Sequence, residues 1–286
     1  MLSDLLHLAW ETRRRNFAAS VRLVHPTKTT AVSLTDRSCG LNCAHCGGHY
    51  LEDMVTLEEA RSLVDAGEAT SLLISGGCSA TGKVPFVPHA KELEGLSRHA
   101  RLNFHVGLVD EEEAALVGSI ASAVSFDFIG DDETIREVYG LSARVEDYLR
   151  SYAALRKHAN VIPHICIGLR GGEISGERAA IRMLKAAGAG SLVFIVLIPT
   201  PGTLYAGVKP PALSEVASIL AEARLEFPPL EVALGCMRPG GRYRRALDVL
   251  ALYAGVNRIV NPTSQAARTA GYLGLSVQYG EECCVL

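Results

Sequence analysis

Hydrophobic residues fall in short, nearly continuous runs rich in Val, Ile and Leu, and longer amphipathic stretches separate these runs. A continuous apolar run of this length is typical of a strand that is buried on both faces, as in a parallel sheet. We predict eight such strands, at residues 29–34, 71–75, 102–108, 123–129, 161–168, 191–198, 230–235 and 257–260.

A helix is predicted after each strand. The first begins at Thr56, where Glu59 three residues later completes a capping-box pattern. The others are predicted at residues 89–99, 111–120, 144–159, 177–187, 214–227, 242–254 and 264–273. Several end in a glycine, which is the usual residue just beyond a helix: Gly67, Gly188, Gly255 and Gly274. Eight strand–helix units predict an α/β fold, a (β/α)8 TIM-type barrel.

The chain shows no low-complexity segment and no linker rich in Pro, Gly or Ser. We therefore expect one domain over residues 1–286, with an extra helix and lead-in at 1–27, the barrel at 28–273 and a tail at 274–286. The last helix of such a barrel ends at its bottom. The extended run at 275–279 is therefore expected to carry the cysteine-containing tail back toward the mouth, where active residues of parallel barrels lie.

Composition narrows the class of protein. The chain has 286 residues, of which 48% are hydrophobic and 21% charged. Its net charge of −3 provides no excess of positive charge that would attract nucleic acid. Three consecutive arginines, Arg13 to Arg15, are interpreted as the solvated face of a helix. No apolar stretch is long enough to span a membrane. Eight cysteines without a secretory signal favour a reducing compartment, which predicts a cytoplasmic protein.

Three cysteines in a polar loop after the first strand carry the strongest chemical signal. Cys39, Cys43 and Cys46 form a C-x3-C-x2-C run. Three thiolates at this spacing can hold three irons of a cubane cluster and leave the fourth iron open. The alternative is zinc on Cys43, Cys46, His45 and His49, although neighbouring residues rarely point at one metal.

The cysteine spacing and its place after a first strand resemble those of the radical S-adenosylmethionine (SAM) enzymes. From about Lys28 to Gln265 the chain is similar to their biotin synthase and lipoyl synthase branch. The resemblance implies a radical SAM barrel with a 4Fe–4S cluster on Cys39, Cys43 and Cys46, whose open iron is chelated by SAM. One electron, from a reductant such as ferredoxin, then splits SAM into methionine and a 5′-deoxyadenosyl radical, which abstracts hydrogen from an unactivated carbon.

The same resemblance suggests a SAM pocket on neighbouring loops. Gly76 and Gly77 resemble the family's GGE segment, which binds the amino group of SAM, but Cys78 replaces the acidic residue. His45 occupies a position that is aromatic in most members. It is expected either to stack beside adenine or bond a cluster sulfur, or to be an exposed loop histidine.

Later loops add weaker signals. Asp127 lies within the fourth strand and is a candidate for binding ribose hydroxyls, whereas Asp131 or Asp132 is explained by helix capping. Arg170, in a glycine-rich segment that resembles the family's adenine border, is either a partner of the SAM carboxylate or an exposed arginine. The turn containing Pro199 and Gly202 resembles the wall of the SAM pocket in biotin-synthase-like members.

Five cysteines lie outside the first motif. Cys166 is interpreted as a core residue, although biotin synthases place a second-cluster ligand in a comparable strand. The remaining four are predicted to converge at the mouth as ligands of a second Fe–S cluster, with structural zinc as the alternative. They are Cys78, Cys236, Cys283 and Cys284.

A second cluster near a carbon radical suggests sulfur insertion. Our leading hypothesis is a sulfur-inserting enzyme similar to the archaeal-type lipoyl synthases, which work as two related proteins. The resemblance implies an octanoylated protein or peptide as substrate and a related radical SAM protein as partner. The alternatives are a biotin-synthase-like enzyme for rearrangement, methylation or cofactor maturation, and a non-catalytic Fe–S or zinc scaffold.

Overall fold

The computed structural model describes all 286 residues, and its chain forms two compact units. Unit 1 comprises Met1–Pro26, Pro163–Pro199 and Gly207–Cys284. Unit 2 comprises Thr27–Ile162, Thr200–Ala206 and Val285–Leu286. Each unit is a parallel sheet with helices packed on it, and the two are described in turn.

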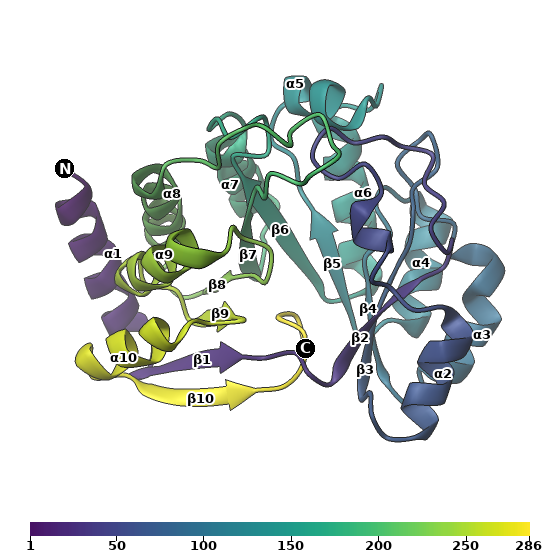
Figure 1. Ribbon diagram of the computed structural model, residues 1–286, viewed down its shortest axis with the longest axis horizontal. Helices are drawn as coiled ribbons and strands as arrows, with labels where there is room; N and C mark the ends of the chain where they lie inside the picture. The colour runs from purple at the N-terminus through teal and green to yellow at the C-terminus, as the bar shows by residue number, and fades with distance from the viewer. The chain divides into compact units, whose positions relative to one another are not determined.

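Unit 2 contains four parallel strands in the order β5-β4-β3-β2 (Figure 1). They are β2 (Thr29–Ser33), β3 (Ser71–Ser75), β4 (Arg101–Phe104) and β5 (Ala123–Asp127). Its helices are α2 (Leu57–Asp65), α3 (Ala90–Leu96), α4 (Glu111–Ile120), the short α5 (Asp132–Thr134) and α6 (Val145–His158). Short helical turns occupy His49–Leu51, Val87–His89 and Ile135–Tyr139. Because all four strands are parallel, their carboxyl ends lie at one edge of the sheet.

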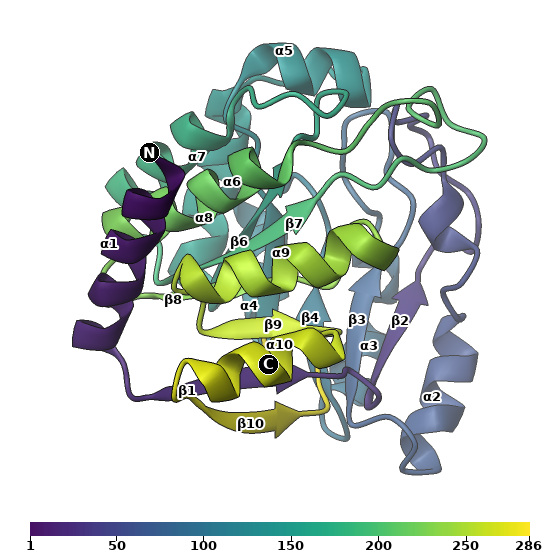
Figure 2. The same ribbon diagram turned by 60° about the vertical axis from the view of Figure 1, so that its left-hand side comes forward.

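Unit 1 contains six parallel strands in the order β10-β1-β9-β8-β7-β6. They are β1 (Ser20–Val24), β6 (Val161–Ile167, within unit 1 from Pro163), β7 (Ser191–Val196), β8 (Glu231–Leu234), β9 (Arg258–Val260) and β10 (Ser276–Gly280). Its helices are α1 (Leu2–Asn16), α7 (Glu177–Ala186), α8 (Leu213–Glu226), α9 (Gly241–Tyr253) and α10 (Ser264–Tyr272). Helices α7 to α10 form one layer of successive neighbours, and α1 packs across α8 and α9 (Figure 2).

The predicted α/β class and all eight predicted strands are confirmed, and the structure adds β1 and β10. β1 was not predicted because Ser20 and Arg22 interrupt its apolar run, and Arg22 is exposed. β10 is the extended run expected at 275–279. It pairs in parallel with β1, so the tail leaves the sheet at the edge where β1 and β9 also end.

The local signals for helix ends are also confirmed. Thr56 caps α2 by accepting a hydrogen bond from the amide of Glu59 at 3.2 Å, and the Glu59 carboxylate accepts one from the amide of Thr56 at 2.8 Å. Asp131 caps α5 in the same way, accepting from the amide of Thr134 at 2.7 Å. None of the helices has the length and apolar character that a membrane-spanning segment needs.

The interpretation of the arginine run as a solvated face is wrong for Arg13. Its side chain is only 1% exposed, lies over the Trp10 ring at 5.6 Å, and donates hydrogen bonds to the carbonyls of Ala18 and Ser20. The guanidinium thus satisfies backbone acceptors where the chain turns from α1 into β1. Arg14 and Arg15 are exposed, as expected.

Candidate functional site

The cysteine loop begins directly after β2, at the carboxyl edge of the sheet of unit 2. Its second half is wound into tight turns, in which the amides of Cys46 and Gly47 both donate to the carbonyl of Cys43 at 3.0 Å. The amide of Ala44 donates to the carbonyl of Val138 at 2.7 Å, which ties the loop to the segment after α5. These backbone hydrogen bonds hold the loop from Cys43 to Gly47 in one compact conformation.

None of the eight cysteines forms a disulfide. In the loop, Cys39 is exposed, whereas Cys43 and Cys46 are half-buried. Burial raises the pKa of the Cys43 thiol to about 12, and the neighbouring charges of Cys46, Cys39 and Cys78 add to the shift. A positively charged metal group removes this penalty, because it stabilises the thiolate form that ligates metals. The donor set of the loop therefore fits an iron–sulfur cluster.

Gly77, in the turn after β3, and Gly40, in the cysteine loop, allow these two segments to lie directly against each other. A Cβ at Gly77 would be 1.9 Å from the carbonyl oxygen of Ser38 and 2.6 Å from the Cα of Cys39, so no side chain fits there. The amide of Gly40 donates to the carbonyl of Cys78 at 2.7 Å. The predicted SAM-binding glycine Gly77 thus has a visible packing role beside the first cysteine.

Gly77→Ala is expected to destabilise the loop by about 1–3 kcal/mol, because the new methyl overlaps backbone atoms that have no space to move into. The variant should bind less iron after anaerobic reconstitution, and chemical analysis of iron checks this. Gly95→Ala is the matched control, because a Cβ at Gly95 meets nothing within 4 Å. Equal iron content in both variants would contradict the packing role.

His45 is half-buried, so its interpretation as an exposed loop histidine is wrong. Its ring meets the edge of Tyr139 with centroids 5.7 Å apart, and its Nδ1 is buried without a hydrogen-bond partner. Burial lowers the pKa of His45 to about 4, against a smaller opposing effect of Asp127. The imidazole is therefore neutral near pH 7 and keeps one polar atom available for a ligand.

Asp127 ends β5, and its carboxylate lies 3.2 Å from Nε2 of His105. Both side chains are more than a third exposed, so the pair stands at the sheet edge rather than in the core. The charge of Asp127 also contributes to the raised pKa values of Cys78 and Tyr148, for which burial is the largest cause. His105 was not predicted as a site residue. The only signal for it is a histidine inside the apolar run at 102–108.

The turn after β7 belongs partly to each unit: its last residue in unit 1 is Pro199, and Thr200–Ala206 belongs to unit 2. Gly202 is exposed in the Thr200–Ala206 segment, which belongs to unit 2 and packs on the cysteine loop. There the amide of Tyr205 donates to the carbonyl of Ala44 at 2.9 Å. Pro199 and Arg170 belong to unit 1. Arg170 is partly exposed in the loop after β6, so its role toward a SAM carboxylate stays a prediction.

The remaining predicted cysteines fall into two places. Cys78 lies beside the cysteine loop, with Cys39 Sγ 3.9 Å from the carbonyl of Cys78, and burial raises its pKa to about 12. Cys236, after β8, and the vicinal pair Cys283 and Cys284, after β10, belong to unit 1, and the Sγ atoms of the pair are 3.9 Å apart. The predicted second cluster stays a prediction, and no three His, Cys, Asp or Glu side chains take the arrangement of ligands to a single metal ion.

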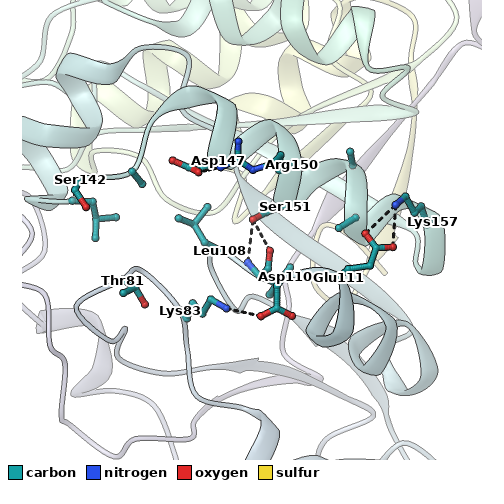
Figure 3. Close-up of a pocket in the computed structure, with 15 residues that line it drawn as sticks. Thr81, Lys83, Leu108, Asp110, Glu111, Ser142, Asp147, Arg150, Ser151 and Lys157 are labelled. Atoms are coloured by element: carbon teal, nitrogen blue, oxygen red, sulfur yellow. Dashed lines mark hydrogen bonds and ion pairs between the residues drawn. The ribbon is translucent and has the colours of Figure 1, made fainter.

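A cavity of about 690 Å³ lies in unit 2 between the start of α4 and α6 (Figure 3). None of the predicted site residues lines it. Its charged groups already pair with one another, Lys83 with Asp110 at 2.9 Å and Lys157 with Glu111 at 2.9 Å. This cavity is therefore separate from the cysteine loop and offers no unpaired charge on these residues for a ligand.

Some known proteins are similar to this chain in sequence or in fold. No protein-family profile matches the chain. The biotin synthase of Ruthia magnifica subsp. Calyptogena magnifica is 22% identical over 278 residues, which cover 90% of this chain and 82% of that protein. The structure of methylornithine synthase (PylB) superposes with a TM-score of 0.70 at 14% identity, covering 97% and 89% of the two chains. The FeFe-hydrogenase maturase HydG from Carboxydothermus hydrogenoformans also gives 0.70, at 16% identity, covering 91% and 63%.

The chain shares its α/β fold with these two structures, and its sequence is similar to that of a biotin synthase.

Proposed function

We propose that this chain is a radical SAM enzyme that inserts sulfur into an unactivated carbon, and that Cys39, Cys43 and Cys46 hold a 4Fe–4S cluster. Held there, the cluster would supply the electron for reductive cleavage of SAM into methionine and a 5′-deoxyadenosyl radical. The observation that carries the proposal is the group of three free thiols on one loop at the carboxyl edge of the sheet, packed against a glycine turn that admits no side chain.

Other residues of unit 2 are proposed to bind and orient SAM. Asp127 stands at the sheet edge with a partly exposed carboxylate, which suits the hydroxyls of a ribose. His105 holds that carboxylate from the side, at 3.2 Å. His45 presents a neutral ring and an unpaired Nδ1 beside the cysteines, which suits an adenine or a cluster sulfur. Together these groups offer polar contacts at the carboxyl ends of β2, β4 and β5.

The sulfur-insertion step is supported by the thiols that remain after the first cluster is assigned. Cys236, Cys283 and Cys284 all belong to unit 1, and the Sγ atoms of Cys283 and Cys284 are 3.9 Å apart, which leaves soft ligands for a second iron–sulfur cluster. Such a cluster would supply a sulfide to the substrate carbon. The resemblance to lipoyl synthases supports an octanoyl-lysine segment of a protein or peptide as substrate. It also supports a related radical SAM protein as partner.

A rearrangement is the second candidate reaction. It is favoured by the likeness of the fold to methylornithine synthase over almost the whole of both chains. In that case the thiols of unit 1 would have a structural role, and no sulfur would reach the substrate.

We expect the anaerobically reconstituted protein to release 5′-deoxyadenosine when given SAM and dithionite. Addition of an octanoylated peptide, with a related partner protein where one is encoded, should yield a product heavier by sulfur. Liquid chromatography with mass spectrometry measures both. Deoxyadenosine without sulfur transfer would favour the rearrangement. No deoxyadenosine under any of these conditions would contradict the proposed cleavage and favour a scaffold.

A further inference from the structure

A short segment after β7 is folded onto the cysteine loop. This segment, Thr200–Ala206, is called the strap. It belongs to unit 2, whereas its neighbours in sequence, Pro199 and Gly207, belong to unit 1. The strap is wound into tight turns, in which the hydroxyl and the amide of Thr203 donate to the carbonyl of Thr200 at 2.7 and 3.3 Å. It is therefore a compact element with its own internal hydrogen bonds.

A tyrosine hydroxyl holds the strap near each of its ends. At its start, the hydroxyls of Thr200 and Tyr50 are 3.2 Å apart, and Tyr50 lies shortly after Cys46 in the chain. Thr200 is only 2% exposed, so its bond to Tyr50 satisfies a hydroxyl that water barely reaches. Near the other end, the hydroxyl of Tyr205 donates to the carboxylate of Glu137 at 2.7 Å.

The cysteine loop is held at Ala44, a buried residue between its last two cysteines. Ala44 is 3% exposed, its amide donates to the carbonyl of Val138 at 2.7 Å, and its carbonyl accepts from the amide of Tyr205 at 2.9 Å. Because Glu137 and Val138 are adjacent in sequence, the bond from Tyr205 to Glu137 closes a ring of contacts around Ala44. The hydroxyl of Tyr205 is the link in this ring that a substitution removes without changing the backbone.

The segment that carries Glu137 has a rare conformation. Ile135–Tyr139 forms a single π-helical turn, and such turns are frequent at functional sites. The Glu137 carboxylate reaches the strap, and the Val138 carbonyl reaches the cysteine loop. The ring of Tyr139 meets the ring of His45, with centroids 5.7 Å apart. Three consecutive residues of this turn thus contact the cysteine loop or the strap.

We propose that Tyr50 and Tyr205 are positioning residues, whose hydroxyls clamp the strap onto the cysteine loop and thereby fix Cys43 and Cys46 as cluster ligands. That these thiols bind a cluster rests on the proposed function, whereas the clamp is argued from the contacts above. Contacts outside the ligands themselves hold metal ligands in orientation, and their loss weakens metal binding.

Hydrogen exchange of the full-length protein before iron is added tests the clamp itself. In the double variant Tyr50→Phe/Tyr205→Phe, we expect the amides of Ala44 and Tyr205 to exchange about 10-fold faster than in the wild type, because two bonds that hold the strap are lost. Nuclear magnetic resonance measures both rates. The matched control is Tyr272→Phe/Tyr279→Phe, which removes two largely exposed hydroxyls of unit 1 and should change neither rate. Unchanged exchange in the first variant would overturn the clamp.

Iron release from the anaerobically reconstituted protein tests the positioning role. The variant Tyr50→Phe/Tyr205→Phe should lose iron to a chelator about 10-fold faster than the wild type. Glu137→Gln should lose it more slowly than Glu137→Ala, since the amide oxygen of glutamine still accepts the hydrogen bond from Tyr205. This rescue by the conservative variant separates positioning from a general loss of stability.

Equal iron release from the wild type and from the double phenylalanine variant of the strap would overturn the positioning role, as would equal release from the two Glu137 variants. A wild-type protein that takes up no iron would refute the proposed function together with the positioning role. Hydrogen exchange would still decide whether the clamp exists, because that measurement needs neither iron nor SAM.

Discussion

Replacing Cys43 with alanine is expected to abolish formation of 5′-deoxyadenosine from SAM. Cys43 is the middle one of the three proposed ligands, and its carbonyl also accepts the two amide hydrogen bonds that form the turn around Cys46. Without its thiolate, a cubane would be held by only two protein ligands and would be lost or degraded. Iron content should fall by about four per chain, and the spectrum of the reduced first cluster should disappear from electron paramagnetic resonance.

The matched control for this prediction is Cys166→Ala. It removes a thiol of unit 1 from β6, outside the cysteine loop. We expect this variant to release deoxyadenosine at the wild-type rate. If Cys43→Ala retained cleavage of SAM, the assignment of the first cluster to the cysteine loop would be wrong.

Asp248→Ala is expected to lower the free energy of unfolding by about 3–5 kcal/mol, because it leaves a buried guanidinium without its counter-charge. Arg238 and Asp248 both have side chains with 0% exposure, and two Arg238 nitrogens donate to one Asp248 oxygen at 2.8 and 3.1 Å. The other Asp248 oxygen accepts from the amide and hydroxyl of Thr263 at 2.7 and 2.8 Å. The pair therefore joins the loop after β8 to α9 and the start of α10.

Equilibrium unfolding in urea measures this loss. Glu94→Ala is the control, because Glu94 pairs with Arg98 at 3.5 Å on the surface of unit 2, with both side chains more than half exposed. An exposed pair of this kind contributes at most about 1 kcal/mol. Similar destabilisation by the two substitutions would show that burial does not decide the strength of the Arg238 pair.

The cysteine loop could be predicted from sequence because its three cysteines lie within eight consecutive residues. A local spacing survives any change in the rest of the fold, and a strand before the loop fixes the edge of the sheet at which it lies. The capping box of Thr56 was predictable for the same reason, since a helix end is decided by residues three positions apart. β1 was not, because its short run is stabilised by pairing with β9 and β10, which are distant in the chain.

The hydrophobic pattern by itself determined the α/β class and eight of the ten strands, and the cysteine spacing predicted the thiol donors of the proposed first cluster. Only the tertiary structure decided which residues stand beside those donors. His105 reaches Asp127 across two adjacent strands, and His164 reaches Cys284 over 120 positions of the chain. Strand order and parallel register decide which residues become such neighbours. Neither can be inferred from the types of residues nearby in the sequence. The burial of Arg238 has the same origin, because its charge is paired with Asp248 on α9 and its guanidinium also donates to the carbonyl of Val260 on β9.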